Sequence, residues 1–132
     1  MNYFLCALDT IYIGIPAERT ERIIPAARVQ TTVFETEEEE AFISLPVLFR
    51  QKDTTAPHGV VLKAGGEHHA AGIVKKVLLT PRIDKDLEIP EENIHQLPEV
   101  LVGPLRFFRG AYFNGQSVIL ILNPEKLMES IR

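Results

Sequence analysis

The 132-residue sequence has a single cysteine and no long uninterrupted run of apolar residues. With only Cys6 available, an internal disulfide is excluded, and the apolar neighbours of Cys6 predict a buried structural thiol. No apolar stretch approaches the roughly 20 residues that a bilayer-spanning helix requires. The first residues, which include Tyr3 and Phe4, lack the basic region of a secretory signal peptide and are typical of a strand. We therefore expect a cytoplasmic protein.

The chain also lacks an excess of basic residues. It has 14 lysines and arginines against 18 aspartates and glutamates, for a net charge of −4. A general nucleic-acid surface or an anionic membrane surface favours the opposite balance. Arg106 and Arg109 lie among aromatic residues, but the overall charge favours ordinary strand positions over base stacking. We expect no nucleic-acid partner and no direct insertion into a membrane.

No cofactor motif stands out. His68 and His69 are adjacent, and adjacent side chains of a strand point to opposite faces, so they are poorly placed to share one metal ion. Gly65-Gly66 lacks the Lys-Ser/Thr pair of a phosphate-binding loop and is predicted to be a hairpin turn. We expect no metal and no cofactor.

A catalytic motif is missing as well. No serine–histidine–aspartate or cysteine–histidine arrangement is evident, although catalytic residues can meet in space from distant positions. Three acidic residues alternate along one short stretch, which we interpret as an exposed polar linker: Asp84, Asp86 and Glu88. The sequence thus predicts that the protein is not an enzyme.

The sequence is rich in signals for short strands and tight turns. Asp9-Thr10, Gly65-Gly66 and Asn114-Gly115 each separate two apolar segments, as two-residue hairpin turns do. The continuous aliphatic run 118–122 predicts a strand that is buried on both faces. Further strands are predicted at 29–35, 41–45, 77–80 and 105–113. This pattern indicates one mostly-β domain, a barrel or a sandwich.

Helices are predicted only as short pieces. Proline at the first helical position favours short helices at 16–22 and 90–97. Asn123 followed by Pro124 is a favourable start for a C-terminal helix, with Leu127, Met128 and Ile131 on one face.

Several of these segments, in this order, resemble the CheW-like domain of bacterial chemotaxis, which the adaptor CheW shares with the regulatory domain of the kinase CheA. The matching segments are the strand pair 4–8 and 11–16, the piece Thr20–Ile23, the hairpin Gly66–Val77 and the closing hairpin and helix Asn114–Met128. They span nearly the whole chain. Each motif is weak by itself, and the similarity depends on their order and spacing.

The resemblance implies a single CheW-like domain over residues 1–132, with two intertwined, five-stranded β-barrel subdomains, short helices and a C-terminal helix. The boundary between the subdomains is expected near residues 57–65. The implied function is that of a non-catalytic scaffold that couples chemoreceptors to a CheA-type histidine kinase. By position, Thr20, Ile24 and Val77 are expected to line a partner-binding groove.

The sequence departs from the family in its partner-facing pattern. The family's Gly-x-x-Asn-Leu-Arg-Gly segment is replaced here by residues that include Glu37, Glu38, Glu39 and Glu40. Ser44 and Lys75 stand where the family has aspartates. We therefore interpret the chain as a divergent member. The run Glu37–Glu40 is either a solvated tip or a surface that selects a basic partner.

An alternative function stays open at this point. A small β-barrel can also bind a small molecule or a nucleic acid, although the charge balance disfavours the second ligand.

Overall fold

A computed structural model describes residues 1–24, 40–63, 75–98, 103–115 and 117–130. The chain forms two compact units. Unit 1 comprises residues 1–19 and 83–132, and unit 2 comprises residues 20–82. Each unit has its own β-sheet, and helices are few and short. The predicted mostly-β fold with two β subdomains and a C-terminal helix is therefore confirmed.

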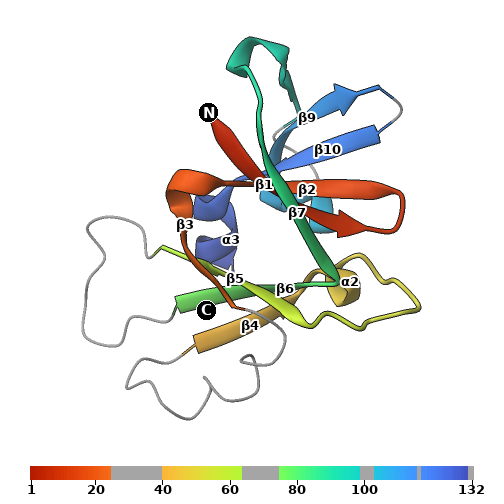
Figure 1. The fold of residues 1–132 in the computed structure, drawn as a ribbon, viewed down its shortest axis with the longest axis vertical. Coiled ribbons are helices and arrows are strands. Elements are labelled where there is room, and N and C mark those ends of the chain that lie inside the picture. Colours follow the sequence, from red (N-terminus) through yellow and green to blue (C-terminus); the bar gives the residue numbers. More distant parts are fainter. Residues whose placement is uncertain (25–39, 64–74, 99–102, 116, 131–132) are drawn as a thin grey trace. The chain divides into compact units, whose positions relative to one another are not determined.

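Unit 1 is built on a sheet of six strands in the order β7-β1-β2-β10-β9-β8 (Figure 1). The strands are β1 (Asn2–Leu8), β2 (Ile11–Pro16), β7 (Arg82–Glu88), β8 (His95–Gln96), β9 (Phe108–Asn114) and β10 (Ser117–Leu122). β2 pairs antiparallel with β1 and parallel with β10, so the two ends of the chain meet in one sheet. Three 3-10 helices, η1 (Ala17–Arg19), η2 (Glu91–Asn93) and η3 (Gly103–Phe107), and the C-terminal helix α3 (Pro124–Ser130) complete the described part of this unit.

Unit 2 holds a sheet of four strands in the order β3-β5-β6-β4. The strands are β3 (Thr20–Ile24), β4 (Glu40–Ser44), β5 (His58–Leu62) and β6 (Lys75–Thr80), and the short helix α2 (Leu45–Leu48) follows β4. Among the described residues the strands thus divide six and four between the sheets, whereas the resemblance implied five and five. The stretch 57–65, where the sequence analysis places a boundary, contains β5, which pairs with both β3 and β6. The assignment of the chain to one CheW-like domain stays a prediction.

The hairpin signals predicted the pairing of strands well. Asp9 adopts a positive φ of 47° in the turn between β1 and β2, and Leu8 pairs with Ile11. In the closing hairpin Asn114 is the last residue of β9 and pairs with Ser117, so the turn begins at Gly115, one residue later than predicted. Gly115 carries the positive φ of 62° that this turn requires. The predicted Gly65-Gly66 turn, the adjacent His68 and His69, and the predicted strand 29–35 lie outside the described residues.

The closing strand β10 is buried as its composition predicted. Ile119, Leu120, Ile121 and Leu122 are all buried, while Val118 is half-buried. On one face of the sheet, Ile119 and Ile121 pack with Tyr3 of β1 in the main core cluster of unit 1. The predicted burial is confirmed for four of the five residues. Cys6 is fully buried too, as predicted.

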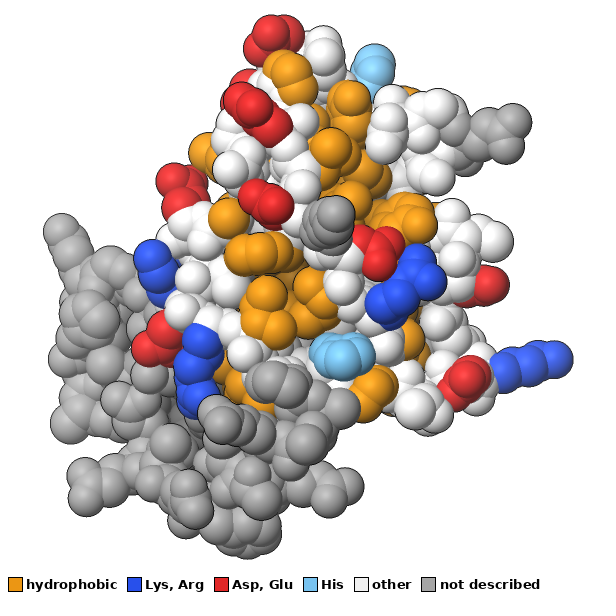
Figure 2. Space-filling model, viewed as in Figure 1, with side chains coloured by type: hydrophobic (Ala, Val, Ile, Leu, Met, Phe, Trp, Pro, Cys, Tyr) orange, Lys and Arg blue, Asp and Glu red, His pale blue; other side chains and the backbone are white. Residues whose placement is uncertain are grey.

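The interpretation of residues 84–88 as a linker is wrong, because Arg82–Glu88 is strand β7. Its apolar residue Leu87 packs against the core cluster, while Asp86 and Glu88 are exposed. Figure 2 shows acidic side chains beside hydrophobic ones over the region where Figure 1 places β7. One-sided burial at an edge strand explains why the segment is polar and still regular.

The predicted short helices are shorter than expected. Segment 16–22 forms one 3-10 turn at Ala17–Arg19 before β3 begins, and segment 90–97 forms one at Glu91–Asn93 before β8. The predicted strand 105–113 begins only at Phe108, because Gly103 (φ 68°) and Pro104 start the 3-10 helix η3. The C-terminal helix is confirmed.

Candidate functional site

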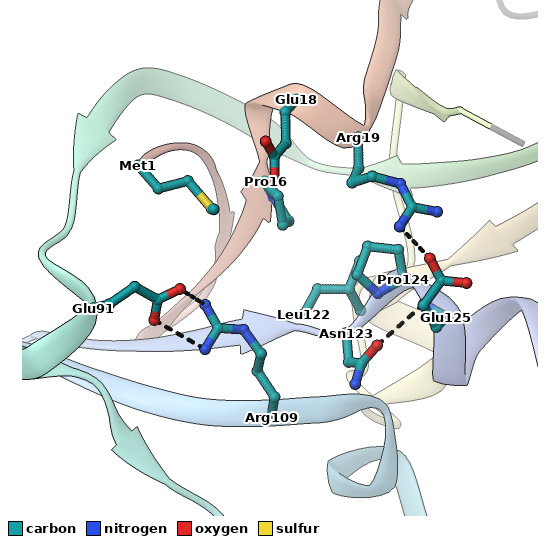
Figure 3. A pocket seen from close by; sticks show the side chains of 10 residues that line it. All are labelled: Met1, Pro16, Glu18, Arg19, Glu91, Arg109, Leu122, Asn123, Pro124 and Glu125. Carbon is teal, nitrogen blue, oxygen red and sulfur yellow. Dashed lines mark hydrogen bonds and ion pairs between the residues drawn. The ribbon is translucent and has the colours of Figure 1, made fainter. Parts of the chain in front are cut away.

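A pocket of about 270 Å³ opens on unit 1, beside the ends of β2, β10 and β9 (Figure 3). Its floor is apolar, since Pro16, Leu122 and Pro124 are all buried. The exposed side chain of Met1 forms one wall. The rim is polar and almost entirely charged, and it consists of Glu18, Arg19, Glu91, Arg109, Asn123 and Glu125.

A bulge in β9 places Arg109 at this rim. On β10, Ile121 pairs with Gly110 and Leu122 pairs with Phe108, so Arg109 has no partner residue on that strand. The sequence analysis predicted an ordinary strand position for Arg109. Arg109 does lie in β9, and as a bulged residue it is rotated out of the regular alternation of the strand.

The Arg109 side chain binds two groups from other elements. Its guanidinium donates to both carboxylate oxygens of Glu91 on η2, at 2.9 and 3.2 Å. Nη2 also donates to the Tyr3 hydroxyl of β1 at 2.7 Å. A bidentate arginine–carboxylate pair fixes geometry better than a single contact does, so this trio joins β9, η2 and β1 at one edge of the pocket.

The Tyr3 hydroxyl is fully buried beneath Arg109. Burial raises the pKa of Tyr3, and the neighbouring Arg109 guanidinium opposes part of that rise. The carboxylates of Glu91 and Glu18 raise the pKa of Tyr3 further by repelling a tyrosinate. Glu18, which lines the pocket, therefore acts electrostatically on the buried hydroxyl of Tyr3.

The opposite rim is held by a second ion pair. Arg19 of η1 donates from Nη1 to Oε1 of Glu125 on α3 (Figure 3). The Asn123 side-chain oxygen accepts the backbone N–H groups of Glu125 at 3.1 Å and Lys126 at 3.4 Å, and so caps α3. The predicted role of Asn123 as the helix cap is confirmed, and the cap holds Glu125 at the rim.

Glu18 differs from the other two acids of the rim. Glu91 and Glu125 are engaged by Arg109 and Arg19, whereas Glu18 makes no ion pair or hydrogen bond with another side chain in the described part of the chain. Its side chain is exposed, and Figure 3 shows its carboxylate near Pro16 on the pocket side of η1. Among the side chains of the rim, three carboxylates face two arginines, and the one without an arginine partner is Glu18.

The charged side chains of this pocket are organised into ion pairs. Both arginines and two of the three carboxylates are engaged with each other. No group of three or more histidine, cysteine, aspartate or glutamate side chains is gathered for a metal ion anywhere in the described ranges. Among the same residues, no helix is long and apolar enough to cross a membrane.

The structure separates the residues that the sequence predicted for partner binding. Ile24 of β3 and Val77 of β6 are 2% and 0% exposed and share one core cluster with Val61. Thr20, half-buried, lies at the other end of β3 and pairs with Leu62. Of these three, only Thr20 offers a side chain to a partner.

Most of the acidic run Glu37–Glu40 lies outside the described residues. Glu37, Glu38 and Glu39 fall outside the described residues, and Glu40 is the first residue of β4, paired with Lys75. The partner-binding role of the run, like that of Thr20, Ile24 and Val77, stays a prediction.

Sequence reasoning missed the pocket. Tyr3 and Arg109 are 106 positions apart, as are Arg19 and Glu125. No spacing rule connects such pairs, because the chain ends meet through tertiary contacts such as the pairing of β2 with β10. The available signals were local ones, the glycine at position 110 within the predicted strand 105–113 and the cap at Asn123.

Comparison with known proteins supports the fold and leaves the family unassigned. No protein-family model matches the chain, and no curated protein matches it. The crystal structure of the scaffolding protein TtCheW from Thermoanaerobacter tengcongensis is similar to it, with a TM-score of 0.64 over 92% of this chain and 83% of that one. The fold is CheW-like. At 12% sequence identity, this similarity is a statement about fold.

Proposed function

We propose that this protein is a non-catalytic scaffold in chemotaxis-type signalling, which couples chemoreceptors to a CheA-type histidine kinase. The observation that carries the proposal is the similarity of nearly the whole chain to the scaffolding protein TtCheW. Fold alone does not specify function, so the chemistry of the surface must also suit a scaffold.

The pocket of unit 1 supports a binding role. Its charged side chains are organised as two ion pairs around an apolar floor. Such an arrangement suits the recognition of another side chain, whereas a general acid or base needs a group that is free to exchange a proton. In this proposal the protein acts through contacts with other proteins and catalyses no reaction.

The partner surfaces named from the sequence are part of this proposal. Thr20 is the accessible member of the predicted groove set, and Ile24 and Val77 would support it from the core beneath. Glu37–Glu40 would add an acidic surface that favours a basic partner. A cytoplasmic location follows from the proposed partners.

Co-elution with a CheA-type kinase encoded in the same genome tests the proposal. The full chain and the purified kinase are mixed and separated by size-exclusion chromatography, with a histidine kinase of another class as the control. We expect a complex with the CheA-type kinase alone. Separate elution from the CheA-type kinase, or equal binding to both kinases, would contradict the proposed function.

A further inference from the structure

We propose that the pocket of unit 1 is an anchor site for a long basic side chain, an arginine or a lysine, of a protein partner. The pocket is lined by the apolar floor of Pro16, Leu122 and Pro124 and by the charged rim that includes Glu18. The inference deepens the proposed scaffold function and depends on it only for the nature of the partner.

The shape of the lining selects an amphipathic side chain. The floor is buried and apolar, while the rim above it is charged. Lysine and arginine side chains match this arrangement, because their aliphatic stem can cover the apolar floor while the charged head stays at the rim, near water. A short polar side chain would leave the floor uncovered.

The charges of the rim select a cation. Arg109 and Arg19 are already engaged by Glu91 and Glu125, which offset their positive charge, and an incoming anion would also meet Glu18. An apolar side chain would remove water from Glu18 without replacing its hydrogen bonds, which costs free energy. A cationic head instead supplies the partner that Glu18 lacks in the described part of the chain.

The rim is also preorganised for this contact. The bidentate Arg109–Glu91 pair and the Asn123 cap of α3 hold the two sides of the pocket without a ligand. A site whose groups are already fixed loses less conformational entropy on binding. The net charge of −4 on the whole chain further favours encounter with a basic partner.

A titration with a minimal probe tests this assignment. The full ¹⁵N-labelled chain is titrated with Nα-acetyl-arginine amide, and amide chemical shifts are followed by NMR. The corresponding citrulline amide, which is neutral and nearly isosteric, is the control ligand. We expect saturable shifts at the pocket residues, near Glu18 and Leu122, with arginine and markedly weaker ones with citrulline.

Matched variants locate the charge that matters. Glu18→Gln should weaken binding of the arginine probe about two- to fivefold, the range for one exposed ion pair. Glu92→Gln removes an exposed carboxylate beside Glu91 that does not line the pocket, and it should leave binding unchanged. Because both glutamates are exposed, both variants should keep the wild-type unfolding temperature.

Three results would overturn the anchor site: equal binding of arginine and citrulline, equal weakening by both variants, or no shifts at the pocket residues. These results leave the scaffold proposal standing if the kinase still co-elutes with the chain. If the probe binds at Glu18 and the kinase does not co-elute, the anchor site holds and the proposed signalling partner is wrong.

Discussion

At the scale of single residues, Arg109 shows how a local irregularity produces a site. A regular strand would place Arg109 opposite a residue of β10, but the bulge leaves it unpaired there and directs it to Glu91 and Tyr3. The sequence feature beside this bulge is a single glycine. Gly110 follows directly, and a Cβ at that position would lie 2.5 Å from Cγ2 of Ile94 and 2.9 Å from the His95 carbonyl oxygen.

Replacing Tyr3 with phenylalanine isolates the buried hydroxyl. The change removes the 2.7 Å bond from Arg109 while keeping the ring in the core. We expect a loss of about 0.5–1.5 kcal/mol in the free energy of unfolding, the usual net value of one hydrogen bond. Urea denaturation at pH 7 measures this loss. An unchanged free energy of unfolding would mean that the hydrogen bond from Arg109 to Tyr3 does not stabilise the fold.

The Tyr3→Phe variant should also differ from wild type in how its stability depends on alkaline pH. The pKa of Tyr3 in the folded state is raised above its usual value of 10.0, so the folded protein holds this proton more tightly than the unfolded chain does. The stabilisation is complete below the unfolded-state pKa and is lost as the pH rises through the folded-state pKa. The stability difference between wild type and Tyr3→Phe should therefore stay constant up to pH 9 and shrink above about pH 10. A difference that grows above pH 10 would contradict the direction of the shift.

At the scale of elements, turn and cap residues specified local structure, and tertiary pairing decided the rest. The Asp9-Thr10 turn, the strand β10 and the start of α3 at Asn123-Pro124 are determined by neighbours in sequence, and the structure confirms them. β7 was missed because its alternation is mostly acidic on the exposed face. Its regularity comes from pairing with β1, more than 70 positions away.

Truncation in β10 tests the importance of the central strand of unit 1. Leu120 is 9% exposed and lies in the middle of β10, between β2 and β9. Leu120→Ala should lower the free energy of unfolding by about 2–5 kcal/mol, as truncations of core aliphatic residues do. Val118→Ala, at a half-buried position of the same strand, is the control and should cost less. Equal costs in chemical denaturation would show that β10 is not buried as described.

Adding one methyl group at Gly110 tests the contact between β8 and β9. The new Cβ would overlap Ile94 and the backbone of His95, so the two strands must separate. We expect Gly110→Ala to cost about 1–3 kcal/mol, the range for overpacking a close contact. At Gly115 nothing lies within 4 Å, so Gly115→Ala tests only the cost of a positive φ. If Gly110→Ala is neutral in thermal denaturation, β8 does not lie against β9 as described.

At the scale of the whole molecule, the sequence predicted the fold class and missed the pocket. Order and spacing of strand motifs are read along the chain, and they were sufficient for a CheW-like fold. The pocket depends on side chains from β2, η1, η2, β9, β10 and α3, which meet only after the sheet has formed. The predicted set of Thr20, Ile24 and Val77 illustrates the same limit, since position in a motif did not reveal that two of them are core residues.

Neutralising the acidic run tests its predicted role in partner choice. Replacing Glu37–Glu40 with glutamine should leave the unfolding temperature unchanged if the run is solvated, and it should weaken binding to the natural partner. Wild-type affinity should also fall as salt rises, because exposed charges are screened over about 8–10 Å at physiological ionic strength. If the variant binds as tightly as wild type at low salt, the run is only a solvated tip and specificity lies elsewhere.

The central claim is that this chain links two partners, and a three-component capture assay tests it most directly. A chemoreceptor cytoplasmic fragment is immobilised, and retention of the CheA-type kinase is measured with and without the full chain. The scaffold account predicts that retention of the kinase rises with the amount of chain added and saturates at a fixed ratio of chain to kinase. Retention that is the same with and without the chain would contradict it.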